Sequence, residues 1–594
     1  MGVFNPSILT EKGKNLIAKS VMGMCNITFT KIAISDTQIA EEPSQLTDIG
    51  EAKQSENVSS VVMQGALQVK VGASFSNIHL TEGYYIRNIG LYAMDPDEGE
   101  ILYSVSVANE STATADWMPP FSNIGASSLV VSIVTSISNA SSVNVTVDPA
   151  GYATVSHIAD LQSQINSVSS FVGYEEDSTY GVEVDFSSKT ITRIAGAETL
   201  IEGADFDALD PWGGRKRCIL TDGGVKLAYY GETCYTESGA LTESITVEGI
   251  EYPVGTHVQV MVEQPIFYIK AVPVKAKNAT SGKGKQYVKA RFYISPTPKV
   301  GFSIPRAFYD DRGIPQDKIY LSAYEGCIQH LAGGGYDLTD NSAVTEAIAG
   351  DFKLSSIAGA KPASGRQNNL TRKCSRIMAR TRGSGWRLHS IFAMAVTEWL
   401  FMVEYASLDP QRKVGQGVSN SIGDGVNAIT GATSSMGNIS GIPVGGEDGK
   451  CSVTYRGEEN LWGNIWTWLD GVNFLAKGVN EVWVAKMGTT LADDITEGYD
   501  CLSAYLSHTE GFISAFGIDD RYPEILIPTE ANGSDTFADY VYENHTYDGF
   551  CVALFGGWKD GSKSGFSLHG RVPSDNYSEI VGARLLYVPQ SITG

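Results

Sequence analysis

The sequence lacks the long apolar segments that membrane insertion or export by a signal peptide would require. No run approaches the roughly 18 consecutive apolar residues of a membrane-spanning helix. Residues 1–19 alternate apolar with charged side chains, without the uninterrupted apolar core of a signal peptide. The longest apolar stretch, residues 391–403, contains Thr397 and Glu398, which predicts a buried helix of a globular protein.

Positive charge is also scarce. The chain has 44 Lys and Arg against 67 Asp and Glu, a net charge of −23 over 594 residues. Nucleic-acid binding needs clustered cations to neutralise phosphates, so the composition argues against nucleic acid as the main partner.

Apolar residues make up 42% of the chain, enough to bury several cores, and at about 150 residues per domain the length predicts about three to five domains. With 63 Gly, 28 Tyr and 21 Phe, the composition favours turns and β-strands.

Motifs for catalysis and metal binding are largely missing. The eight cysteines lie far apart, without the pair spacing of a zinc site, which favours buried thiols over a disulfide framework but leaves both open. There is no Gly-x-Ser-x-Gly elbow in a strand–helix setting and no His-Glu-x-x-His. We therefore expect no enzyme activity and no cofactor. Two alternatives stay open: a carboxylate pair in a glycan depolymerase, and structural calcium on Asp205, Asp207 and Asp210.

Residues 1–147 show the pattern of a small α+β domain with a mostly antiparallel sheet. A helix is expected over residues 10–22, capped by Thr10. A polar turn at residues 95–100 suits a hairpin. Strands are expected at residues 27–34, 58–71, 84–94, 101–107, 129–137 and 143–147.

The same segment resembles the N-terminal domain of phage tail-collar fibre proteins. The resemblance depends on the helix that begins Leu9-Thr10-Glu11-Lys12-Gly13-Lys14, on the strand Phe29-Thr30-Lys31-Ile32-Ala33-Ile34, and above all on Asn88-Ile89-Gly90-Leu91-Tyr92-Ala93 with the hairpin that follows it. It implies that this domain attaches a fibre to the phage tail or baseplate.

Residues 148–175 form a linker with a short heptad pattern. After Asp148-Pro149-Ala150-Gly151, apolar residues recur at spacings of 3, 4, 3 and 4. They are Ile158, Leu161, Ile165, Val168 and Val172. Barely two heptads are present, too few for a stable isolated helix, so we expect a short parallel stalk held by folded parts at both ends, trimeric by analogy with phage fibres. The alternative is one amphipathic helix that packs on its own chain.

The remaining chain is expected to form two parts, a β-rich spacer at residues 176–300 and a C-terminal domain at residues 301–594. The second part should contain helices at residues 369–381 and 386–406. A long Gly-, Asn- and Ser-rich loop at residues 415–449 is expected to be exposed and flexible.

Three ordered motifs in the C-terminal part resemble the C-type-lectin-like fold of formylglycine-generating enzymes and of variable proteins of diversity-generating retroelements. They are Gly463-Asn464-Ile465-Trp466-Thr467-Trp468, then Gly556-Gly557-Trp558, and finally Gly582-Ala583-Arg584. Thr467 replaces the usual Glu, the Gly-Gly turn lacks its Ser, and Ala583 replaces Phe. The oxidase chemistry of this group needs cysteines between the second and third motifs, and this sequence has none there.

In the retroelement group the stretch between the second and third motifs is the diversified ligand surface, so the resemblance implies a receptor-binding site here. An aromatic plane with short polar groups suits recognition of a glycan or a protein. The alternative is an ordinary polar loop over the core. The candidate residues are Trp558, Lys559, Asp560, Ser562, Lys563, Ser567, His569, Arg571, Asp575, Asn576 and Tyr577.

Together these patterns predict an α+β, β-rich multidomain protein: an antiparallel attachment domain, a coiled-coil stalk, a β-rich spacer and a C-type-lectin-like tip. We expect a phage or prophage tail-fibre protein, made in the host cytoplasm and located in the virion tail. Its expected partners are tail or baseplate proteins and a bacterial surface glycan or protein receptor. We expect neither nucleic acid as a partner nor membrane insertion.

The stalk can be tested through the mass of the full-length protein in solution. Light scattering should give three times the chain mass of 63.8 kDa, because the heptad seam is expected to join three copies. A monomeric mass would contradict the stalk.

Overall fold

The computed structural model describes most of the chain, and it forms two compact units, Met1–Ile165 and Asn166–Gly594. The described residues are 4–63, 68–77, 79–108, 116–121, 128–137, 178–367, 370–421, 428–476, 478–534, 537–542, 550–554, 556–566, 568–572 and 578–591. Both units are rich in β-structure and contain several sheets.

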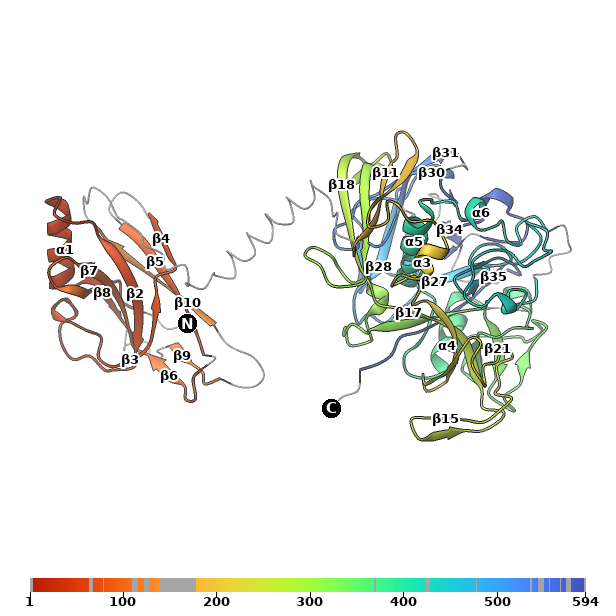
Figure 1. The fold of residues 1–594 in the computed structure, drawn as a ribbon, viewed down its shortest axis with the longest axis horizontal. Helices are drawn as coiled ribbons and strands as arrows, with labels where there is room; N and C mark the ends of the chain where they lie inside the picture. The colour runs from red at the N-terminus through yellow and green to blue at the C-terminus, as the bar shows by residue number, and fades with distance from the viewer. Residues whose placement is uncertain are drawn as a thin grey trace. The chain divides into compact units, whose positions relative to one another are not determined.

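The described part of the N-terminal unit is built on antiparallel strands and the α-helix α1 (Glu11–Val21) (Figure 1). Its main sheet has the order β1 (Ile8–Leu9), β8 (Gly99–Val107), β7 (Asn88–Asp95), β2 (Thr28–Ser35), β3 (Ala52–Asn57). A second sheet has the order β10 (Ser128–Ser136), β5 (Gln68–Ser76), β4 (Ser60–Met63), and β6 (Tyr84–Ile86) pairs with β9 (Asp116–Met118).

Helix α1 forms as its sequence predicts. The Thr10 hydroxyl accepts a hydrogen bond from the Gly13 amide at 3.0 Å, which satisfies one of the free N–H groups of the first turn. Leu16 and Ile17 are buried one helical turn after Gly13. A Cβ at Gly13 would lie 2.1 Å from the Tyr103 carbonyl oxygen, so glycine allows the helix to approach β8 closely.

The predicted hairpin is also confirmed, as the connection between β7 and β8. The Asp95 carboxylate accepts hydrogen bonds from the amides of Asp97 and Glu98, which closes the turn. Lys19 reaches the same carboxylate at 2.8 Å and ties the end of α1 to the hairpin. Two predicted strands are each split in the structure: residues 58–71 lie largely in β4 and β5, and residues 84–94 in β6 and β7. The strand expected at residues 143–147 lies outside the described residues.

Over its described residues, the second unit contains two large sheets, several smaller ones and four α-helices. One large sheet has the order β14 (Lys226–Tyr229), β13 (Lys216–Thr221), β17 (Val258–Pro265), β20 (Lys318–Ser322), β36 (Leu585–Tyr587), β24 (Trp386–Leu388). The other has the order β29 (Tyr499–Cys501), β28 (Asn480–Ala485), β27 (Trp466–Ala476), β33 (Phe550–Leu554), β34 (Leu568–Val572), with β35 (Val581–Gly582) parallel to β27.

The smaller sheets and the helices complete this unit. A four-stranded sheet has the order β12 (Thr190–Ala195), β11 (Tyr180–Asp185), β19 (Lys285–Ser295), β18 (Tyr268–Asn278). One three-stranded sheet has the order β22 (Tyr336–Asp337), β21 (Cys327–His330), β23 (Phe352–Ser355). Another has the order β31 (Pro528–Gly533), β30 (Gly511–Phe516), β32 (Tyr540–Val541). Two-stranded pairs are β15 (Ile245–Val247) with β16 (Ile250–Tyr252) and β25 (Thr454–Tyr455) with β26 (Glu458–Glu459). The helices are α3 (Ala204–Asp207), α4 (Arg372–Thr381), α5 (Ile391–Tyr405) and α6 (Pro410–Lys413).

Helix α5 is the central helix of the unit, and all of its side chains are buried. It is shorter than the helix expected over residues 386–406, because residues 386–388 pair with β36 as strand β24. The helix starts only after Ser390, whose hydroxyl accepts a hydrogen bond from the Ala393 amide. The preceding helix, expected over residues 369–381, begins at Arg372 behind a Thr371 cap.

No domain boundary lies at residue 300 in the described chain, where the sequence suggested one between residues 176–300 and 301–594. Strand β17 pairs with β20 across that position, and one hydrophobic core extends from Tyr180 to Val588. Helix α5 contacts β11 and β19 on one side of the expected boundary and β27 on the other. The spacer strands therefore bury their apolar faces against the C-terminal helix and form one unit with it.

Fully buried arginines donate to backbone carbonyls at strand ends and in turns of this unit. Arg584, which is 0% exposed, donates to the backbone oxygens of Ser322 and Glu459, each at 2.8 Å. Arg217 donates to the Gly457 oxygen at 2.9 and 3.2 Å. A buried carbonyl needs a hydrogen-bond donor, and a guanidinium offers five N–H groups.

Two further findings concern the described residues only. Their helices include none with the length and apolar character needed to cross a membrane. The seven cysteines whose side chains the structure describes carry free thiols.

Replacing Arg584 tests how much these buried contacts stabilise the second unit. Arg584→Met leaves two buried carbonyl oxygens without their donor, and we expect the free energy of unfolding to fall by about 3 kcal/mol. Urea unfolding followed by tryptophan fluorescence measures this, since Trp117 is the only one of nine tryptophans that precedes the second unit.

Arg312→Met is the matched control. Its side chain is 40% exposed and its carboxylate partner Asp310 is 3.9 Å away, so the unfolding midpoint should change little. Equal midpoints for the two variants would contradict a stabilising role of Arg584.

Candidate functional site

The structure brings the three C-terminal motifs together. Strand β35 of the third motif runs parallel to the first motif, with Val581 opposite Trp466. The glycines of the second motif press against the first: a Cβ at Gly556 would lie 2.8 Å from the Gly463 nitrogen. A Cβ at Gly557 would lie 3.1 Å from Trp466 Nε1. This close packing explains why glycines occupy both positions.

The turn after Gly557 is fixed from the inside by Asp560. Asp560 Oδ2 accepts hydrogen bonds from the Gly557 amide at 2.6 Å and from Trp466 Nε1 at 2.7 Å. Burial raises the pKa of Asp560, although both hydrogen bonds favour its ionised form. Asp560 therefore anchors the turn to strand β27 through Oδ2, a structural role in addition to the ligand contact that the sequence suggested for it.

The segment at residues 415–449 supports the same turn. The Ser421 amide donates to the Trp558 oxygen at 2.8 Å, and the Gly561 amide donates to the Ser419 oxygen at 2.9 Å. Deeper in the segment, Thr433 is buried and its hydroxyl donates to Glu459 Oε2 at 2.6 Å. Ile439 and Val444 of this segment are exposed, as expected. The expectation of a free loop is wrong where the segment is hydrogen-bonded to the turn and to the core, at Ser419, Ser421 and Thr433.

Asn464 of the first motif ties the second half of this segment down. Its side chain accepts a hydrogen bond from the Ala428 amide at 2.6 Å and donates to Glu325 Oε2 at 2.7 Å. Burial raises the pKa of Glu325 to about 8, against the attraction of Arg584. The first motif thus holds the segment at residues 415–449, which supports the turn, against the core.

Trp558 is not a surface residue. Its side chain is 2% exposed, so the aromatic plane expected to face a ligand lies inside the unit. The turn that Asp560 closes directs the following residue, Lys559, outward instead.

Three of the predicted residues are presented to solvent. Lys559 and Ser562 are exposed, and the Lys563 side chain is 42% exposed. Lys563 Nζ lies 4.5 Å from the centre of the Tyr540 ring and 3.8 Å from Glu510 Oε1. Two cations and a hydroxyl therefore project from a turn whose backbone is fixed.

Tyr540 and Glu510 are neighbours of the site that the sequence did not suggest. They come from β32 and from the segment before β30, and the Tyr540 hydroxyl donates to Glu510. Nothing in the local pattern links these positions to Lys563, because the pairing of β30 with β32 brings them together.

The other predicted site residues fall outside what the structure describes. Ser567, Asp575, Asn576 and Tyr577 are outside the described residues, and for His569 and Arg571 only the backbone, in β34, is described. The stalk residues also lie outside them: Ile158, Leu161, Ile165, Val168 and Val172.

The three aspartates considered for calcium have other contacts. Asp205 accepts a hydrogen bond from the Ile201 amide at 2.7 Å, and Asp207 pairs with Arg456 at 2.9 Å. Asp210 precedes a cis proline. Over the described ranges, no three or more His, Cys, Asp or Glu side chains are grouped to hold a metal.

Comparisons with known proteins add one likeness. No protein-family model and no curated protein matches the chain. Among solved structures, the Major Tropism Determinant I1 and U1 variants are similar to it, each with 12% identity and a TM-score of 0.23. Each match covers 68% of this chain and 94% of the chain of the variant. The M1 variant matches over 69% of this chain and 95% of its own, also with 12% identity and a TM-score of 0.23. At this TM-score the likeness supports no conclusion about function.

The anchoring role of Asp560 predicts the effect of its removal. Asp560→Ala leaves the Gly557 amide and Trp466 Nε1 without their acceptor, which should cost about 2 kcal/mol and loosen the turn. Hydrogen exchange measured by mass spectrometry should show faster exchange in peptides that cover residues 556–563. Ser562→Ala, at an exposed position of the same turn, should leave the exchange unchanged; equal exchange in the two variants would contradict the anchor.

Proposed function

We propose that the chain is a receptor-binding protein of a phage tail fibre, attached through its N-terminal unit and binding a bacterial surface receptor through the second unit. The receptor contacts would be made by the turn that carries Lys559, Ser562 and Lys563. One observation carries this proposal. Asp560 fixes the backbone of the turn by hydrogen bonds to its inner side, while the side chains of Lys559, Ser562 and Lys563 point outward.

Such a turn suits recognition because its side chains do not hold the fold. Binding costs less when the contact residues stand on a pre-ordered backbone. The surface residues between the second and third motifs can therefore differ between receptors without loss of the frame, as in proteins diversified by a retroelement. No cofactor is required for this activity.

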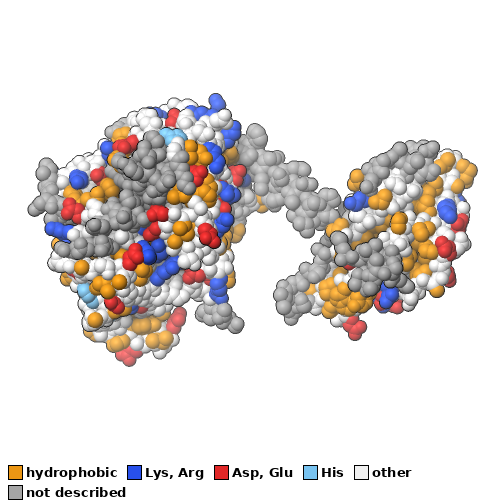
Figure 2. All heavy atoms as spheres, turned by 180° about the vertical axis from the view of Figure 1, so that it is seen from behind, with side chains coloured by type: hydrophobic (Ala, Val, Ile, Leu, Met, Phe, Trp, Pro, Cys, Tyr) orange, Lys and Arg blue, Asp and Glu red, His pale blue; other side chains and the backbone are white. Residues whose placement is uncertain are grey.

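The N-terminal unit supports the attachment half of the proposal. Its helix α1 and its β7–β8 hairpin follow the order of elements in the collar-fibre resemblance. Exposed apolar side chains lie on one face of its three-stranded sheet, where Val62, Val130 and Val134 are 60%, 54% and 38% exposed. Figure 2 shows hydrophobic side chains over much of the drawn face of this unit. Exposed apolar groups of this kind suit docking on a tail or baseplate protein.

Several copies on one fibre would strengthen a weak contact. If the fibre is a homotrimer, each tail would present three turns, and a second contact would form at high effective concentration. The net charge of −23 per chain makes separate fibres repel one another and favours their solubility, and the two lysines of the turn differ in sign from this charge. On the face drawn in Figure 2, acidic and basic side chains are interspersed rather than gathered in one patch.

Binding to whole cells tests the proposal. Labelled full-length protein is first screened against a panel of bacterial strains, and a binding strain then serves to compare variants. Lys559→Ala with Lys563→Ala should weaken binding about tenfold, since the loss of about 1.4 kcal/mol in contacts corresponds to that factor.

The matched control is Lys373→Ala with Lys486→Ala, which removes two cations that are each 53% exposed elsewhere on the same unit. Binding by this control should equal that of the unchanged protein. Unchanged binding by the Lys559 and Lys563 variant would reject the turn as the site, and binding to no strain would reject the function. Release of oligosaccharides from the bound cells would favour a depolymerase instead.

A further inference from the structure

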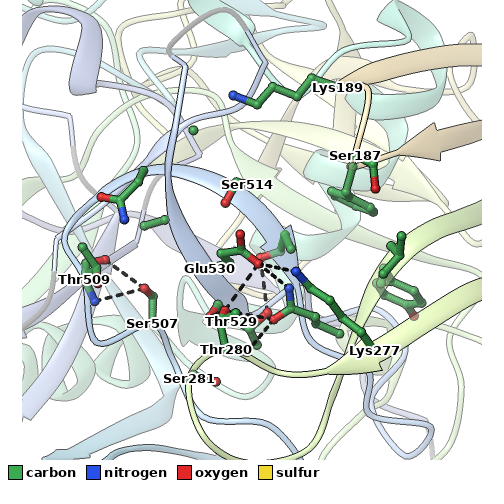
Figure 3. Close-up of a pocket in the computed structure, with 18 of the residues that line it drawn as sticks. Ser187, Lys189, Lys277, Thr280, Ser281, Ser507, Thr509, Ser514, Thr529 and Glu530 are labelled. Carbon is green, nitrogen blue, oxygen red and sulfur yellow. Dashed lines mark hydrogen bonds and ion pairs between the residues drawn. The ribbon is translucent and has the colours of Figure 1, made fainter.

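A polar cleft of about 550 Å³ lies in the second unit, at a place that the sequence did not single out (Figure 3). Its walls come from the end of β11, the turn between β18 and β19, the segment before β30, and strands β30 and β31. All of these belong to the same unit.

Hydroxyl groups dominate the lining. They include Ser187, Thr280, Ser281, Thr509, Ser514 and Thr529. The Ser281 side chain is 1% exposed, and its hydroxyl has no hydrogen-bond partner in the described structure. A buried hydroxyl without a partner is costly, which is the expected condition of a group that a ligand completes.

Ser514 faces the cleft because the strand that carries it is irregular. The pairing of β30 with β31 shifts register between Ile513 and Ala515, so Ser514 has no partner residue in the ladder. Such bulges turn a side chain out of its strand and are frequent beside functional sites. Figure 3 shows the Ser514 hydroxyl next to Glu530.

Glu530 is the charged centre of the cleft. Its Oε2 accepts hydrogen bonds from Gln286 Nε2 at 2.6 Å and Lys277 Nζ at 3.0 Å, with the Thr280 hydroxyl at 3.4 Å. Burial alone would raise the pKa of Glu530, but the hydrogen bonds from Lys277 and Gln286 outweigh it and hold the pKa below its usual value. Oε1 takes part in none of these contacts, so an ionised acceptor is held in a fixed direction.

We propose that this cleft binds a neutral sugar unit of an oligosaccharide, with Glu530 Oε1 accepting hydrogen bonds from sugar hydroxyls and Ser281 and Ser514 completing the set. A sugar offers many hydroxyls that both donate and accept, which matches a lining of hydroxyls around one carboxylate. The rings of Phe186 and Tyr287 lie behind this lining, stacked 6.3 Å apart and only 7% and 4% exposed, so the polar groups supply the contacts with the sugar.

The charges of the cleft favour a neutral sugar over an acidic one. Lys277 is paired with Glu530, which cancels its charge at the centre. Lys189 is exposed at the edge of the cleft and forms no ion pair with any residue the structure describes. A polyanion would need several such cations side by side. The proposal is independent of the receptor-binding turn, since the two sites share no residue.

The test uses purified full-length protein and a panel of neutral and acidic oligosaccharides, screened on an array and followed by calorimetry. A neutral member should bind, and Ser281→Ala with Ser514→Ala should weaken its binding about tenfold. These substitutions break no internal hydrogen bond of the described structure, so the fold is kept and the change reports on the ligand. Lys559→Ala with Lys563→Ala should bind the sugar normally, which separates this site from the turn.

Three outcomes would overturn the proposal. They are no binding of any neutral oligosaccharide at concentrations of about 10 mM, equal binding by the Ser281 and Ser514 variant, and a preference for acidic members of the panel. Glu530→Gln, which keeps the size of the side chain and removes its charge, should also lose affinity.

Discussion

The second unit depends on buried guanidinium groups that donate hydrogen bonds to backbone carbonyls at strand ends, in turns and where a strand is irregular. Arg584 donates to the oxygens of Ser322 and Glu459, the last residues of β20 and β26, and Arg217 donates to the Gly457 oxygen in the turn between β25 and β26. Arg372 donates to the Leu469 and Val472 oxygens at 2.9 and 2.6 Å, where strand β27 departs from its pairing with β33. A water-exposed loop would not need these donors. Because the segments are buried, each arginine fixes the path of the chain as well as its stability.

The rigidity of the receptor-binding turn depends on these buried arginine contacts. Arg584 holds Glu459, and the Glu459 carboxylate in turn binds Thr433 and the Gly431 amide. Asn464 and Asp560 continue the connections to the turn. The glycines of the motifs are required because backbones approach one another within this network, rather than for flexibility. A surface built in this way presents side chains from a fixed backbone.

The sequence predicted the features that depend on local signals. Helix α1 and the β7–β8 hairpin follow from the Thr10 cap and the polar turn at Asp95, which act over a few residues. The meeting of the three C-terminal motifs could also be expected from their order. The orientation of Trp558 could not, because a motif gives a position in the chain and not the side of the turn that faces the core.

The boundary expected at residue 300 was wrong since α5 supplies the apolar surface for strands on both sides of it. The sequence did not reveal the cleft around Glu530, because its lining residues extend from Phe186 to Gly533 and come together only through the tertiary pairing of β19 with the β30 region.

Helix α5 also limits how genes for such proteins can exchange parts. A recombination joint at residue 300 would separate β17 from β20 and combine an α5 from one parent with β11 and β19 from another. The chimera would inherit mismatched halves of one core. A joint close to the division between the two units, at residues 165 and 166, leaves every described sheet of the second unit intact. We therefore expect that recombination transfers a new binding specificity when the whole second unit is exchanged, with the turn and the cleft together.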